Sequence, residues 1–533
     1  MKKIILPVLL SLAAVSAGAQ NYSDALRYGQ NEYFGTARSM AMGNAFTALG
    51  GDLGSMGINP AGSAVNKYSQ YSITPAVSVA SGSASYNSFD KTSYTTSTDN
   101  SDAKFTLPSV GMSMYFNTGR KYGLRGFSLG LAGNASSYYM DDIQAGGQNA
   151  KTSYMGYLAD EATRNQLSAT KLNSASYWDM SPQWWPEMVG YRTAMISAIG
   201  SGDNGPYVGS AQGTDAGYPL LGTLDQTYGR SNSGFKYDMV MNMGFNIDNR
   251  LYIGANLGLV SIEYKSDTWI RESAVNPNDF AITFDGNTDH FHNMGFHESF
   301  EAEGAGIYGK FGVIYLPVDG LRLGAAIQTP VANYITEHMW FSGDAEYDKA
   351  HYYETISSDD EYQYDYKLVT PWRYNVGIAY TIPGFGAISA DYEMCDYSSS
   401  KFKSRNSNDN SEWADANQSI KDYCGIAHEF RLGAEWKATP SFAVRAGYNL
   451  TTSPERYFDG AGQKKTPSAY KNTASLGIGY SSTGSFFCDL AGRMTFRPDE
   501  YIYPYPTYNE TDSPEIVNSE NLITVALTLG WRF

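Results

Sequence analysis

The sequence predicts an all-β protein, a 14-stranded antiparallel transmembrane β-barrel plugged by a small N-terminal helical hatch. Three observations predict this class. The chain begins with a secretory leader, large apolar residues alternate with polar ones in many segments, and the polar links between these segments are alternately short and long.

Residues 1–19 have the features of a signal peptide. Lys2 and Lys3 precede a short apolar stretch, and Ala17-Gly18-Ala19 forms a small-residue cleavage site. The alternative is a buried N-terminal helix, for which the downstream sequence offers no packing partner. We therefore expect secretion and a mature chain that starts at Gln20.

Composition excludes several classes of protein. The 533 residues include 43 Tyr and 54 Gly, and the mature part has no apolar run long enough for a spanning helix. The net charge of -16 argues against nucleic acid as a partner, because nucleic-acid binders carry basic patches. Three Cys are too few for a disulfide scaffold.

The clearest strand is the C-terminal one. From Ile523 to Phe533 every odd position is apolar and large, and every even position is small or polar. A terminal Phe on such a strand resembles the signal read by barrel-assembly machinery, so Phe533 is expected to contact that partner. An edge strand of a soluble sandwich is the alternative, although it rarely keeps Trp and Phe on one face up to the last residue.

The same period of two recurs in thirteen other segments, which makes an even total of fourteen. Nearly all charged residues fall on the face opposite the apolar one, as expected if lipid meets one face and the lumen the other. The segments are 71–79, 110–116, 127–131, 235–245, 251–259, 307–315, 321–327, 372–380, 388–394, 430–436, 442–448, 476–480, 486–496 and 523–533.

Link lengths decide between a membrane barrel and a soluble sandwich. Tight links such as Pro383-Gly384 alternate with long polar ones, of which 140–232 is the largest. Short turns on one side and long loops on the other are typical of outer-membrane barrels, with the short turns in the periplasm. We therefore assign residues 67–533 to a barrel in the outer membrane of a Gram-negative cell, a monomer surrounded by outer-membrane lipids.

Residues 20–66 differ from the wall and are assigned to the hatch. Ala, Met and Gly alternate at helix-like spacing before Gly50-Gly51, and Asn59-Pro60-Ala61 follows. Flexible and aromatic side chains suit varied hydrophobic ligands, so Met40, Met42, Phe46 and Leu49 are the predicted ligand-binding residues. Asn59, Pro60 and Ala61 are predicted to fix the hatch against the wall. A disordered periplasmic arm is the alternative.

The segment from Phe34 to Phe46, followed by Asn59-Pro60-Ala61, resembles the hatch of the long-chain fatty-acid transporter (FadL/TodX) family. Weaker similarities follow in family order, among them Thr370-Pro371-Trp372-Arg373. The resemblance implies uptake of a hydrophobic small molecule, a long-chain fatty acid or similar, held in a lumenal pocket and released sideways into the bilayer. Residues 140–232 are longer than this family leads us to expect.

Sideways release requires a break in the wall. By resemblance to the family, the third strand is where the wall bends inward, and this strand contains Gly130, Gly133 and Asn134. We therefore predict a lateral opening beside these three residues. The alternative is that the glycines only relieve crowding in a tapering barrel. Pro75 and Pro108 lie in the first two strands.

Other constellations point to no enzyme, cofactor or metal. The sequence has no nucleophile motif, phosphate loop or metalloprotease pattern, and His290 and His292 lie on a loop without a second anchoring element. Cys395 and Cys424 flank one outer loop and are candidates for pairing. Two other functions remain open: a barrel scaffold for surface interaction or protein secretion, and haem or porphyrin acquisition by the Tyr-rich loops.

Overall fold

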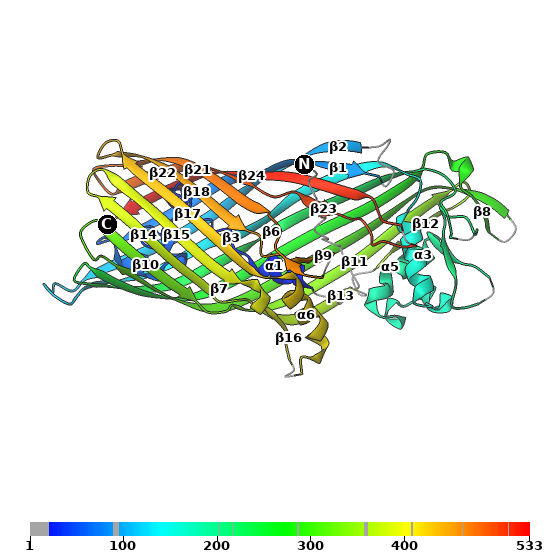
Figure 1. The fold of residues 1–533 in the computed structure, drawn as a ribbon, viewed down its shortest axis with the longest axis horizontal. Coiled ribbons are helices and arrows are strands. Elements are labelled where there is room, and N and C mark those ends of the chain that lie inside the picture. The colour runs from blue at the N-terminus through cyan, green and yellow to red at the C-terminus, as the bar shows by residue number, and fades with distance from the viewer. Residues whose placement is uncertain are drawn as a thin grey trace.

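The structure is a computed structural model, and it describes residues 21–88, 95–200, 202–215, 217–284, 287–356, 361–406, 409–460, 462–509 and 511–533. The predicted signal peptide lies outside these residues. The described chain forms one elongated barrel with the hatch inside it and helices at one end (Figure 1).

The predicted 14-stranded antiparallel barrel is confirmed. Eleven of the fourteen barrel strands are continuous: β1 (Gln70–Asn87), β2 (Thr95–Asn117), β3 (Leu124–Asn149), β6 (Leu224–Ile247), β7 (Leu251–Ala274), β9 (Asn287–Tyr315), β17 (Ile426–Lys437), β18 (Phe442–Thr452), β21 (Tyr470–Ser481), β22 (Phe486–Phe496) and β24 (Glu515–Arg532). The other three barrel strands are each interrupted and consist of two segments: β10 (Leu321–Gln328) and β11 (Ala332–Tyr347), β13 (Tyr362–Val369) and β14 (Arg373–Ile382), and β15 (Gly386–Asp396) and β16 (Lys401–Ser404).

The first and last strands close the barrel. β1 pairs with β24 from Gln70 opposite Arg532 to Asn87 opposite Glu515. Ser69 and Phe533 extend this seam by exchanging two backbone hydrogen bonds of 3.0 Å. Closure leaves the first and last strands without a free edge, which is the condition for a sheet that meets lipid.

The outer surface has the pattern of a membrane-spanning wall. In β14, Tyr374, Val376, Ile378 and Tyr380 are 43–52% exposed, whereas the inward Asn375 is 1% exposed. Aromatic residues stand at the two ends of this row and aliphatic residues between them, as in the aromatic girdles of membrane barrels. A soluble sandwich would bury this apolar face, so the surface decides for a transmembrane barrel.

Helices contribute no span of their own. No helix among the described residues combines the length and the apolar character that crossing a bilayer requires.

The prediction that residues 140–232 form a long loop is wrong at both ends of this range, because β3 continues to Asn149 and β6 already begins at Leu224. Strands outside lipid pair without needing an apolar face, so their polar composition resembles that of a loop. Between them, residues 150–223 form an external cap. Its elements are α3 (Tyr154–Arg164), α4 (Ala169–Leu172), η3 (Tyr177–Asp179), η4 (Pro182–Trp184), α5 (Trp185–Arg192), β4 (Ile196–Ala198) and β5 (Tyr207–Gly209).

The cap stands at the long-loop end of the barrel, away from the C-terminus (Figure 1). Trp185, Met188 and Val189 of α5 are fully buried in its core. Smaller elements complete the long loops: η5 (Pro277–Asp279), β8 (Ala281–Phe284), β12 (His351–Thr355), η7 (Tyr397–Ser399), η8 (Ser411–Trp413), α6 (Ala414–Tyr423), β19 (Tyr457–Phe458), β20 (Lys464–Lys465) and β23 (Glu500–Ile502).

The hatch consists of short helices with side-chain caps. They are α1 (Tyr22–Gly29), α2 (Ala37–Ala41), η1 (Gly54–Gly57) and η2 (Pro60–Ala64). Asn21, Thr36 and Asn59 each cap one helix by accepting a hydrogen bond from a backbone N–H two or three residues further along the chain. The helix α2 contacts β21 and β22, and η2 contacts β6, β7 and β9, which places the hatch inside the barrel.

The membrane belt predicts the effect of a charge on its outer face. Leu476, 67% exposed between Tyr470 and Tyr480 on β21, faces lipid. We expect Leu476→Arg to lower the free energy of unfolding by about 2–4 kcal/mol, measured by urea unfolding in lipid vesicles. Tyr122→Arg is the matched control, because Tyr122 lies in a short turn and is 84% exposed. Equal effects of the two changes would contradict this placement of the belt.

Candidate functional site

Basic side chains of the wall hold the hatch by its backbone carbonyls. Five of them, each from a different strand, donate into the hatch: Lys236 to Tyr28 (2.7 Å), Arg373 to Gly29 (2.5 Å), Arg493 to Tyr33 (3.0 Å), Lys310 to Gly57 (2.7 Å) and Arg322 to Leu49. Short helices leave most of their carbonyls without intrahelical partners, and buried carbonyls without a donor cost free energy. The wall supplies the donors that the hatch lacks.

Asn59 is a second anchor between hatch and wall. Its side chain is fully buried, and Nδ2 donates to the carbonyl of Thr47 at 2.6 Å and to that of Val313 in β9 at 3.2 Å. Its Oδ1 accepts from Ala61 N at 3.1 Å, so Pro60 is placed at the first position of η2. A Cβ on Gly312 would come within 1.9 Å of Asn59 Oδ1, so this close approach requires glycine in the wall.

The four predicted ligand-binding residues of the hatch are all buried, but they do not surround one cavity. Met42, Phe46 and Leu49 pack with Tyr33 and Ile58 in one apolar cluster. Met40 belongs to a different cluster. Three of the four therefore fill the contact between hatch and wall, and Met40 alone lies on the side of the hatch that carries Phe34.

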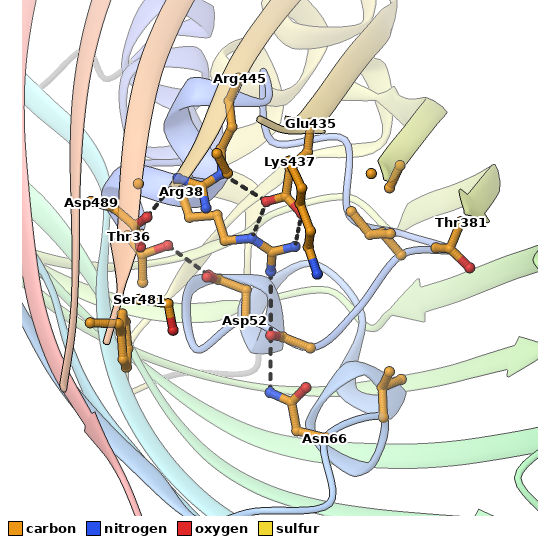
Figure 2. A pocket seen from close by; sticks show the side chains of 18 of the residues that line it. Thr36, Arg38, Asp52, Asn66, Thr381, Glu435, Lys437, Arg445, Ser481 and Asp489 are labelled. Carbon is orange, nitrogen blue, oxygen red and sulfur yellow. Dashed lines mark hydrogen bonds and ion pairs between the residues drawn. The ribbon is translucent and has the colours of Figure 1, made fainter. Parts of the chain in front are cut away.

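A polar cavity of about 580 Å³ lies between the hatch and the short turns at Pro383 and Pro440. Figure 2 shows polar side chains that line it, among them Arg38 and Glu435. Arg38 pairs with Glu435 at 2.9 Å, and Arg445 joins Glu435 at 2.8 Å to Asp489 at 2.6 Å. Leu49 is the one predicted ligand-binding residue that borders this cavity. The ion pairs of this cavity fit a water-filled vestibule better than a site for an apolar molecule.

A second cavity, which we call the external pocket, lies in the external cap and has a volume of about 360 Å³. Glu187 from α5 and Glu298 from β9 line it together with aromatic residues of α3, η4, β6, β9 and the loop after β23. These aromatic residues are Tyr154, Tyr157, Trp184, Tyr228, Phe296 and Tyr505. None of these residues was predicted from the sequence. The signals were the dense Trp184-Trp185-Pro186 and Tyr503-Pro504-Tyr505-Pro506 runs.

The wall has a break between β2 and β3. β2 pairs with β3 only from Asn117 opposite Gly126 to Ser109 opposite Asn134. Beyond that point β3 stays paired with β6 and β2 with β1, while no ladder joins β2 to β3. The β1–β2 register shifts beside Pro108, which has no N–H to donate to a ladder.

The predicted opening beside Gly130 and Gly133 is therefore wrong in position. Gly130 pairs with Ser113 and Gly133 with Val110, and both also pair with β6. Asn134 is the last paired residue, so it marks the lower edge of the break. The irregularity in β3 next to the break is a bulge between Ala135 and Ser137, whereas Gly130 and Gly133 lie in regular register.

The hatch takes the place of β2 at this bulge. Phe34 N donates to the carbonyl of Ala135 at 2.9 Å, and Glu32 N donates to that of Ser136 at 2.7 Å. The β3 backbone thus exchanges one partner strand for the hatch and loses no hydrogen bond at these two carbonyls.

A row of aromatic rings runs from the hatch to the break. The ring of Phe34 lies 4.8 Å from that of Tyr138, whose hydroxyl is 3.1 Å from the hydroxyl of Tyr237. The Tyr237 hydroxyl donates to the carbonyl of Leu107 in β2 and so spans the break. Met40, Met140 and Ala80 pack in the same cluster, which makes this path apolar.

The histidine and cysteine candidates form no further site. His290 and His292 bind opposite oxygens of Asp348 at 2.6 and 2.7 Å, and the described residues contain no cluster of three metal-ligating side chains. Cys395 and Cys424 are both buried free thiols, so the pairing considered from sequence is not formed.

Comparison with known proteins gives matches in structure alone. No protein-family model and no curated protein matches the sequence. A FadL homologue of Pseudomonas aeruginosa superposes with a TM-score of 0.50 at 11% identity, over 94% of this chain and 99% of that one. The toluene transporter TodX of P. putida gives a TM-score of 0.50 at 12% identity, over 93% and 98% of the two chains. The chain has the fold of these two proteins. Function rests on the site itself.

The Asn59 anchor predicts how the hatch can be loosened. Asn59→Ala leaves the carbonyls of Thr47 and Val313 without this donor, at a cost of about 1–3 kcal/mol. We expect higher permeability to small sugars in a liposome-swelling assay, with an unchanged heat-induced mobility shift of the barrel on gels. Asn66→Ala is the control, since Asn66 donates to the carbonyl of Gly51 within the hatch itself. Unchanged permeability of the Asn59 variant would show that the anchor does not hold the seal.

Proposed function

We propose that this protein is an outer-membrane channel that takes up hydrophobic small molecules and releases them sideways into the bilayer. The observation that carries the proposal is the break between β2 and β3, reached from the hatch by an apolar row of rings. The resemblance of the hatch motif to the FadL/TodX family and the fold shared with TodX, described as a toluene transporter, support it.

The membrane belt gives the break a direction. Phe105 on β2 is 76% exposed and pairs with Val77, which is 49% exposed, so apolar outer-face residues flank the break. A ligand with roughly 200 Å² of apolar surface avoids a cost of about 5 kcal/mol if it enters lipid rather than water. The downward route is also filled by the hatch and ends in a polar vestibule. Lateral exit is the less costly path.

The break and the apolar row behind it also distinguish uptake from the two alternative functions, a surface scaffold and haem acquisition. A scaffold for surface interaction or secretion needs neither a broken wall nor an apolar row behind it. Haem carries two carboxylates that call for basic partners, and among the described residues no Lys, Arg or His lines the external pocket. Of the hatch residues, we assign ligand contact to Met40, and to Met42, Phe46 and Leu49 the packing of the hatch on the wall.

Closing the break tests the route. The side chains of Thr106 in β2 and Tyr138 in β3 lie near each other across it, so a Thr106→Cys, Tyr138→Cys double variant can be bridged by a bis-methanethiosulfonate reagent. Cys488→Ser removes the one native cysteine that is not buried. We expect the bridged protein to lose at least about tenfold of its uptake rate for a neutral hydrocarbon into lipid vesicles, since exit then requires entry into water.

The control is the same variant after reduction, which should regain its rate. A bridged barrel that transports as fast as the reduced one would refute lateral exit. Loss of the rate in both forms would instead assign the effect to the missing Tyr138 ring.

We also propose that Phe533 is recognised during assembly. Its side chain is 68% exposed, and its ring lies 6.3 Å from that of Tyr71. Deleting Phe533 should lower the amount of protein assembled in cells several-fold while leaving unassisted refolding into vesicles unchanged, because the seam keeps its ladder from Gln70 to Asn87. Equal losses in both measurements would make its role structural.

A further inference from the structure

The external pocket is acidic in a way that a site for plain hydrocarbons does not require. Three of its sixteen lining residues are glutamates, and none is Lys, Arg or His. Glu161 is neutralised by Arg164, with which it pairs. Glu187 and Glu298 form no ion pair within the described residues, so two carboxyl groups face this cavity without a counter-charge.

Glu187 is the more deeply buried of the two. It lies in the first turn of α5, is 3% exposed, and its Oε2 has no hydrogen-bond partner in the described part of the chain. Trp185 beside it is fully buried and donates to the carbonyl of Tyr177 at 2.9 Å, which fixes this turn. A buried carboxyl oxygen without a donor is costly, and such groups mark places where a ligand completes the hydrogen bonding.

Burial also changes the protonation of both groups. It raises the pKa of Glu187 to about 8, with a smaller contribution from the charge of Glu161, and it raises the pKa of Glu298 to about 7. A positive charge placed between them would favour the ionised carboxylates, whereas a third carboxylate would add repulsion. The pocket therefore disfavours anionic ligands.

Aromatic rings surround the two carboxyl groups. The rings of Tyr157 and Tyr505 are stacked at 6.3 Å, and Tyr154 lies 5.0 Å from Phe296 and 6.2 Å from Tyr505. The hydroxyl of Tyr505 is held by Thr152 at 3.2 Å, which fixes its ring. Ring faces attract cations that have lost part of their hydration, and the same rings bury an apolar body.

We propose that the external pocket binds organic cations, molecules that carry a protonated amine on a hydrophobic body, with Glu187 and Glu298 as counter-charges inside an aromatic cage. The inference rests on the proposed function, because it takes this pocket as the place where the transported molecule first binds. An ammonium group has three donors, enough for a glutamate carboxylate and the carbonyl or hydroxyl oxygens beside it. A carboxylate at the same place would meet no cationic group, because no Lys, Arg or His of the described chain lines the pocket.

Three probes of nearly equal size test the chemistry on the unaltered protein. Calorimetry in lipid nanodiscs compares 2-phenylethylammonium, 2-phenylethanol and 3-phenylpropanoate. We expect the ammonium to bind at least about tenfold more tightly than the alcohol, and the carboxylate to bind more weakly than both. Equal affinity for the ammonium and the alcohol, or tighter binding of the carboxylate, would overturn the proposal without any mutation.

Variants then assign the charges. Glu187→Gln and Glu298→Gln should each lower ammonium affinity about tenfold while leaving the affinity for the alcohol within about twofold. Glu301→Gln is the matched control on β9, because Glu301 pairs with Lys265 at 2.6 Å and does not line the pocket. Unchanged ammonium affinity in both pocket variants would remove the counter-charges from the proposal and so refute it. Each variant is first checked for the heat-induced mobility shift of a folded barrel.

Failure of this inference and failure of the proposed function give different results. Ammonium selectivity in binding, with no uptake into vesicles, would overturn the channel and leave the pocket. Uptake of a neutral hydrocarbon that the bridged variant abolishes, with no preference for amines in binding, would overturn the pocket and leave the channel.

Discussion

The structure depends on the exchange of hydrogen bonds between lumenal cations and hatch carbonyls. The hatch occupies the lumen of the barrel. Because it consists of four short helices, it has more buried backbone carbonyls than its own N–H groups can pair with. A buried Lys or Arg in the wall is equally costly without an acceptor. Lys236, Lys310 and Arg373 each donate to a hatch carbonyl, so the buried cations gain acceptors and the buried carbonyls gain donors. The inward charges of the strands and the irregular backbone of the hatch are thus two halves of one arrangement.

The same exchange produces the break in the wall. A strand can leave its neighbour only where its backbone finds other partners, and Phe34 and Glu32 of the hatch supply two of them to β3. On the β2 side of the break, Pro108 has no N–H, and the register of β2 against β1 shifts beside it. Here β2 therefore lacks a backbone donor that would need a partner on β3. Position of the hatch and position of the break are therefore coupled. A hatch held less firmly, as in the Asn59 variant, leaves the carbonyls of Ala135 and Ser136 dependent on water.

The sequence predicts well wherever lipid imposes its pattern. Fourteen alternating segments could be located because every outward residue of the belt must be apolar, as Leu476 and Ile478 are. Outside the belt this constraint ends, so the polar ends of β3 and β6 resembled loops. The prediction of an opening beside Gly130 and Gly133 rests on the resemblance of the third strand to that of the FadL/TodX family, with which the glycines are consistent. The actual break lies beside a bulge at Ser136 stabilised by a distant segment, and no local pattern reports such a long-range contact.

The external pocket and the break are suited to opposite ends of one amphiphilic molecule. Glu187 lies in the cap and Glu298 on the part of β9 that borders the same pocket, where a charged head remains near water, whereas Tyr138 and Tyr237 lie on the path to the break. A ligand that moves body first from the cage to the break needs no passage of its charge through the apolar row. Its head then arrives at the level of the lipid headgroups, where ammonium groups find anionic partners. In the proposed route, the order of acidic cage, aromatic row and lipid-facing gap lets the apolar body leave water before the charge has to move.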